Sequence, residues 1–76
     1  MVQPDDIKRW IETALPGSRV RVTGDGQHFE AVVESSEFAG KSMVAQHQIV
    51  YGCLGDKMRA EIHALSIRTL TPGQAE

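Results

Sequence analysis

The chain of 76 residues has few of the residues that build several common kinds of functional site. It holds one cysteine, Cys53, so it forms neither an internal disulfide nor a CxxC metal site, which is typical of a reducing compartment. Aromatic residues make up 5% of the chain, which leaves few rings for stacking on nucleic-acid bases. No apolar run approaches the roughly 20 residues that a membrane-spanning helix needs.

The chain also lacks a basic excess. Eight basic and ten acidic side chains leave a net charge of −2 at pH 7, whereas non-specific nucleic-acid binding depends on cations that neutralise phosphates. The N-terminus has no signal-peptide pattern, and the acidic pair Asp5 and Asp6 is unlike a transit peptide. We therefore expect a cytoplasmic globular protein with no membrane contact, folded as a single domain over residues 1–76.

The length argues against catalysis. It is below the usual size of a catalytic domain, and a chain this short buries only about 60–65% of its unfolded surface. One layer of helices on one sheet leaves little room for a deep pocket that excludes water. The spacing of serine, cysteine, histidine and aspartate suggests no nucleophile with its base. The sequence therefore predicts a protein that binds partners and is not an enzyme.

The first half of the chain predicts a helix and a hairpin. The helix opens at Pro4 and ends before Pro16, because apolar residues between these prolines recur at helical spacing. They are Ile7, Trp10, Ile11, Ala14 and Leu15. Residues 19–23 then alternate as a half-buried strand, and Gly24–Gly26 forms the turn. The returning strand places Phe29, Ala31 and Val33 on its inner face. Glu30 and Glu34 on its outer face are expected opposite Arg19 and Arg21.

The second half predicts two helices and a last strand. After a loop anchored by Phe38, Ser42 caps a helix. One face of this helix collects Met43, His47, Val50, Tyr51 and Leu54. Gly55 and Asp56 open a short third helix that carries Met58 and Ile62. Residues 64–70 form the third strand, with Leu65 and Ile67 inward. The helical crossover favours a parallel pair with the second strand. An α+β fold follows: a mixed three-stranded sheet with helices packed on one face.

Five segments together resemble one known family. They are Phe38–Ser42 (FAGKS), His47–Tyr51 (HQIVY), Glu61–Ile67 (EIHALSI), Thr69–Pro72 (TLTP) and the hairpin Gly24–His28 (GDGQH). Together they resemble the BolA family, and the hairpin, which comes first in the chain, is most similar to its bacterial IbaG/YrbA branch. The resemblance covers essentially the whole chain and implies the αββααβ arrangement of the class II KH-like fold. One departure is Gln46, where many members have an arginine.

The resemblance also implies a metal site. BolA-like proteins bind a [2Fe–2S] cluster jointly with a monothiol glutaredoxin, for cluster trafficking or iron sensing. His63 matches the family's characteristic histidine ligand, and His28 matches a second position that holds histidine or cysteine in many members. Four ligands are needed, and two imidazoles on one iron are known from Rieske centres. The glutaredoxin cysteine and a glutathione cysteine complete the set. Without the resemblance, a histidine at either position is more often a surface or capping residue than a metal ligand.

Further predictions concern the individual ligands and the free protein. The glycine-rich hairpin predicts that His28 is an adjustable, secondary ligand on a mobile tip, while His63 sits on firmer backbone between helix and strand. His47 is expected to be a buried or boundary histidine, and Cys53 a small core residue. The free protein is expected to be a monomer or a weak homodimer.

An alternative reading is a KH-like nucleic-acid-binding regulator of transcription. KH domains clamp the nucleic-acid backbone with a GxxG loop. The segment Gly52–Gly55 has this spacing, but it lies late in a predicted helix and lacks basic residues. Nucleic-acid binding is therefore expected to be weak.

Overall fold

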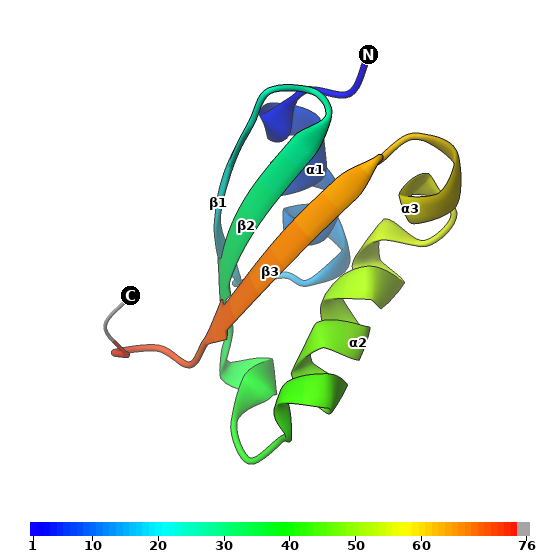
Figure 1. Ribbon diagram of the computed structural model, residues 1–76. Helices are drawn as coiled ribbons and strands as arrows, with labels where there is room; N and C mark the ends of the chain where they lie inside the picture. Colours follow the sequence, from blue (N-terminus) through cyan, green and yellow to red (C-terminus); the bar gives the residue numbers. More distant parts are fainter. Residues whose placement is uncertain (75–76) are drawn as a thin grey trace.

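The computed structural model describes residues 1–74 (Figure 1). The elements follow in the order helix, strand, strand, helix, helix, strand, with a turn of 3-10 helix after the second strand. Their bounds are α1 Pro4–Ala14, β1 Arg19–Gly24, β2 His28–Glu34, η1 Ser36–Phe38, α2 Met43–Leu54, α3 Lys57–Ala60 and β3 Ala64–Leu70. This order confirms the predicted α+β fold. No helix among the described residues is both long and apolar enough to cross a membrane.

The three strands form one mixed sheet in the order β1-β2-β3. Strands β1 and β2 are antiparallel because a short turn joins them. Strands β2 and β3 are parallel, as predicted, because α2 and α3 return the chain to the same end of the sheet. In Figure 1, α1 lies behind β1 and β2, and α2 runs beside β3.

The core lies between the helices and one face of the sheet. Alternate residues of β2 point into it, as the strand period requires. Its largest fully buried side chains, each below 2% exposure, are Phe29, Phe38, Ile7, Ile11, Leu54, Val33 and Val50. Each such side chain contributes about 1.5–3 kcal/mol by burial. The predicted inner face of β2 and the predicted anchor Phe38 are both confirmed.

The hairpin register differs in part from the prediction. Arg19 is the Cα partner of Glu34, as expected, but Glu30 is the partner of Thr23 and not of Arg21. The register follows from the connection of residues 25–27 between the strands, and the turn geometry decides which residues meet. Opposite charges are therefore direct Cα partners where Arg19 meets Glu34.

Helix α2 does not have the single apolar face that was predicted. Val50 and Leu54 are buried, and His47 is half-buried. Met43, however, is 69% exposed and Tyr51 is 40% exposed. Tyr51 follows Val50 by one residue, about 100° around the helix, which turns it away from the core. The apolar stripe predicted for α1 was wrong for one residue, Ala14, which is the last residue of that helix and is exposed.

Gln46 links three parts of the fold, a role that sequence reasoning missed. Its Nε2 donates to the carbonyl oxygens of Phe38, at 3.1 Å, and Lys41, at 2.9 Å. Its Oε1 accepts a hydrogen bond from the Thr69 hydroxyl. One amide side chain thus satisfies backbone groups of the loop after η1 and ties α2 to β3.

Candidate metal centre

The hairpin end of the sheet carries the first candidate ligand, His28. The Asp25 carboxylate accepts hydrogen bonds from the backbone N–H groups of Gln27 and His28, both at 2.9 Å. The Asp25 N–H donates to the His28 carbonyl oxygen at 3.2 Å. The donated hydrogen bonds, that from His28 foremost, hold the pKa of the Asp25 carboxyl below its ordinary value. His28 is therefore hydrogen-bonded through both its backbone N–H and its carbonyl oxygen.

Gly24 makes this tight turn possible. A Cβ atom at this position would come within 2.5 Å of the His28 carbonyl oxygen and of Cδ1 of Phe29. No side chain fits there without a shift of the backbone. Gly26, in the turn itself, has φ +97°, a conformation that favours glycine.

The second candidate ligand, His63, lies in the connection between α3 and β3, as predicted. On one side of it, Ile62 is 4% exposed, and its N–H donates to the Lys57 carbonyl oxygen at 2.8 Å. On the other side, Ala64 begins β3. Ile62 lies two residues beyond the end of α3, so the prediction that the helix carries it was wrong. Burial of Ile62 nevertheless anchors the connection.

The parallel pairing brings the two candidate ligands to the same end of the sheet. His28 is the Cα partner of Ala64, and His63 immediately precedes Ala64. Adjacent strands lie about 4.8 Å apart, so the two histidines have neighbouring backbones although they are far apart in the sequence. Both residues are exposed, and a shallow depression of about 270 Å³ borders His63. A partner protein can therefore reach both imidazoles.

No third ligand completes the pair within residues 1–74, where no group of three or more histidine, cysteine, aspartate or glutamate side chains is placed to hold a metal ion. Cys53 lies on α2, packs against the core and is partly buried, as predicted. Burial raises the pKa of its thiol, which disfavours the thiolate form in the free protein. His47 is also on α2, at the boundary of the core as expected.

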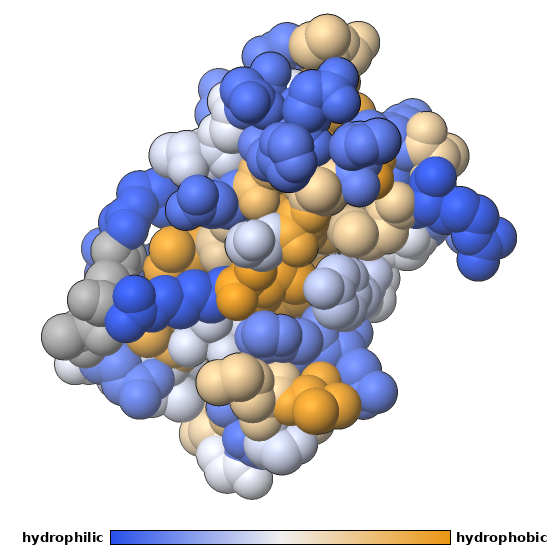
Figure 2. All heavy atoms as spheres, viewed as in Figure 1, coloured by the Kyte–Doolittle hydropathy of each residue, from blue (hydrophilic) through white to orange (hydrophobic). Residues whose placement is uncertain are grey.

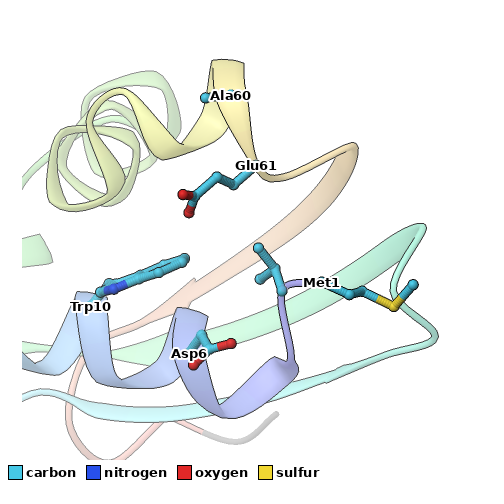
Figure 3. Close-up of a pocket in the computed structure, with 6 residues that line it drawn as sticks. Met1, Asp6, Trp10, Ala60 and Glu61 are labelled. Carbon is cyan, nitrogen blue, oxygen red and sulfur yellow. The ribbon is translucent and has the colours of Figure 1, made fainter.

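A second depression, of about 470 Å³, lies next to the connection, between the start of α1 and the end of α3 (Figure 3). The Glu61 carboxylate reaches into it toward the Trp10 ring, with Asp6 on the opposite side. Arg9 pairs with Asp6 at 3.0 Å, and Lys57 Nζ lies 5.0 Å from the Trp10 ring centroid. Asp6 and Trp10 are therefore already in contact with the cations of Arg9 and Lys57. Nothing in this depression points to catalysis.

The GxxG segment at Gly52–Gly55 does not form a loop. Its first three residues belong to α2, and Gly55 caps the helix with φ +54°. A KH clamp needs these glycines in a loop that approaches the nucleic-acid backbone. This segment instead ends a helix, as its sequence predicts.

Comparison with known proteins extends over nearly the whole chain. A family model described as BolA-like protein matches residues 11–74. Acid stress protein IbaG of Escherichia coli (strain K12) is 35% identical over 74 residues, which cover 96% of this chain and 88% of that protein.

Solved structures give the same result. A bolA protein homologue from Coxiella burnetii superposes with a TM-score of 0.88 and is 52% identical, covering 95% of this chain and 94% of that one. The BolA domain of SufE1 from Arabidopsis thaliana has a TM-score of 0.80 and 29% identity, with the same two coverages. These similarities include both histidine-bearing segments.

Proposed function

Since this chain belongs to the BolA family, we propose that it is an accessory protein of iron–sulfur cluster handling, which holds a [2Fe–2S] cluster jointly with a monothiol glutaredoxin. His63 is the principal ligand in this proposal, and His28 is the second. The function is trafficking of the cluster or sensing of iron status. The similarity to a BolA domain within SufE1 links the domain to iron–sulfur processes.

The observation that carries the proposal is the pairing of His28 with Ala64, which makes His28 and His63 neighbours at one exposed end of the sheet. Two imidazoles supply half of the four ligands that a [2Fe–2S] cluster requires. The described residues offer no thiolate or carboxylate to complete the set. An incomplete, exposed ligand pair suits a cluster shared with another protein better than one held by this chain alone.

The chemistry of the donors fits a shared cluster. Neutral imidazole binds iron and imidazolium does not, so cluster retention depends on pH. Thiolates come from the glutaredoxin cysteine and from glutathione, and histidine ligation raises the reduction potential above that of an all-thiolate cluster. This chain's part is to present the two imidazoles on anchored backbone and to dock on the partner.

The proposal is tested by mixing this protein with a cluster-loaded monothiol glutaredoxin while visible absorption and circular dichroism are recorded. Wild-type protein should change the cluster spectrum and saturate at a fixed ratio. The variant His63→Ala should fold normally, because His63 is exposed, and should abolish the spectral change.

His47→Ala is the matched control. It removes an imidazole from α2, away from the paired sheet end, and should leave the titration unchanged. A His63→Ala titration identical to that of the wild type would contradict the proposal.

A further inference from the structure

The depression between the start of α1 and the end of α3 is lined by an aromatic ring and two carboxylates. Its volume of about 470 Å³ falls in the range of ligand sites. Figure 3 shows the Trp10 ring along this depression, with the Glu61 carboxylate directed toward it and Asp6 on the opposite side. Trp10 is half-buried, so part of its ring is open to solvent. Tryptophan faces and carboxylate oxygens are groups that bind ammonium and guanidinium ions.

A cation of this chain already lies over the ring. Lys57 Nζ is 5.0 Å from the Trp10 ring centroid, inside the distance of about 6 Å at which a ring attracts a cation. The depression stays open with Lys57 in this position. The ring therefore attracts cations, and a second one has room beside Lys57.

Of the two carboxylates, Glu61 is the one left for a ligand. Asp6 accepts a hydrogen bond from the Gln3 N–H at 2.8 Å and pairs with Arg9 at 3.0 Å. The Gln3 N–H, Arg9 and the N-terminal amino group together lower the pKa of the Asp6 carboxyl. Glu61 is exposed, and its carboxylate makes no hydrogen bond or ion pair within residues 1–74. Glu61 therefore supplies the negative charge that a second cation beside Lys57 requires.

We propose that this depression receives a basic side chain, arginine or lysine, of the protein that shares the cluster. This docking contact rests on the proposed function, because its position beside His63 decides which protein reaches it. Ala60 and Glu61 line this depression and also the shallower one that borders His63. A protein that binds a cluster at His63 therefore also covers the space between Glu61 and Trp10.

Charge suits this end of the molecule better than apolar contact. In Figure 2 the hairpin end of the sheet is covered mainly by hydrophilic residues, so polar and charged contacts hold a partner there. Between Trp10 and Glu61, a basic side chain makes a cation–π contact on one side and charge-assisted hydrogen bonds on the other. Its aliphatic stem packs on the half-buried Val2. Acidic side chains are repelled, so the contact also selects the orientation of the partner.

The test is a titration of this chain with cluster-loaded glutaredoxin. Calorimetry gives the dissociation constant, and visible circular dichroism reports whether the cluster is ligated. Glu61→Gln removes the charge of an exposed side chain and keeps its size. It should raise the dissociation constant about two- to fivefold and make it less sensitive to added salt. The circular-dichroism change at saturation should stay that of the wild type. Glu61→Lys should weaken binding further, because like charges then meet.

Glu37→Gln is the matched control. It makes the same charge change at an exposed position of η1, which follows the end of β2 and lies at the far end of the sheet from His63. This variant should bind like the wild type.

A second measurement locates the contact. Trp10 is the only tryptophan of the chain, so incorporation of 5-fluorotryptophan gives one fluorine NMR signal from the depression. That signal should shift when glutaredoxin binds. A signal that does not move at saturation, or Glu61→Gln with wild-type affinity and salt dependence, would overturn the docking contact and leave the shared cluster standing. A complex that depends on Glu61 but leaves the cluster spectrum unchanged would instead contradict the shared cluster. The absence of any complex would overturn both.

Discussion

The two segments that carry the histidines reach the same end of the sheet but are held there by different forces. The hairpin before β2 is held by polar contacts at the surface: the Asp25 carboxylate binds the N–H groups of Gln27 and His28. The connection before β3 is held by the burial of Ile62, which is 4% exposed and joins the core. Hydrogen bonds exposed to water contribute little net stability, whereas a buried aliphatic side chain contributes several-fold more.

This difference predicts how each segment responds to substitution. Damage to the α3–β3 connection should lower the stability of the whole domain, because its anchor is part of the common core. A substitution in the hairpin should cause a smaller and more local loss of stability, unless the new side chain forces the strands apart.

Ile62→Ala should have the largest effect on stability. Removing a buried isoleucine side chain destabilises by about 2–4 kcal/mol, which is a large fraction of the stability of a domain this small. Urea unfolding followed by far-UV circular dichroism measures it. Val44→Ala removes an exposed aliphatic side chain and should change stability little; equal losses for the two variants would mean that Ile62 does not anchor the connection.

Gly24→Ala should come second. The added methyl group overlaps the His28 carbonyl oxygen and the Phe29 ring, and overpacking of this kind costs about 1–3 kcal/mol. Gly52→Ala is the control, because a methyl group there meets nothing within 4 Å and the position is helical. That variant should be more stable than the wild type by about 0.5–1 kcal/mol. If Gly24→Ala and Gly52→Ala were destabilised equally, the cause would be the replacement of glycine itself and not crowding at the hairpin.

Asp25→Asn should have a smaller effect, and one that depends on pH. The folded-state pKa of Asp25 is lowered by the N–H groups of His28 and Gln27. Its contribution to stability is therefore complete above the unfolded pKa of about 3.9 and is lost as pH falls through the lower folded value. Thermal melts at pH 7 should favour the wild type over Asp25→Asn, and the difference should narrow below pH 4. A difference that is constant with pH would show that the carboxylate charge plays no part.

His28→Cys should change stability least, because His28 is exposed and its backbone contacts remain. The substitution should instead change the properties of the cluster. A thiolate in place of an imidazole should keep the cluster in the glutaredoxin complex and lower its reduction potential. It should also make that potential depend less on pH, because one titrating imidazole has been removed. Voltammetry of the complex over a range of pH measures both. A potential and pH slope equal to those of the wild type would leave His63 as the one ligand from this chain.

Much of the candidate site could be predicted because its parts are local. The alternation of Phe29, Ala31 and Val33 specifies a strand with one buried face, and His28 directly precedes that pattern. His63 stands between a short helix and a third strand in the sequence, and the structure places it there. Backbone periods of two and 3.6 residues are properties of short segments, so they can be read without knowledge of the fold.

The contacts that hold the site were decided by the tertiary structure. The sequence did not disclose that Asp25 binds the backbone of His28, that Gln46 joins the loop, α2 and β3, or that Glu30 lies opposite Thr23. Nor did helical spacing reveal that Met43 is exposed at the same time as Val50 is buried.

The physical reason is that local pattern determines which face of an element is apolar, but not which neighbour it meets. The amino-acid sequence by itself determined the elements of this protein, their order and most of the core. Only the assembled sheet decided that His28 pairs with the residue after His63. That neighbourhood depends on strand pairing and register, which are set by turn geometry and by the packing of the whole domain.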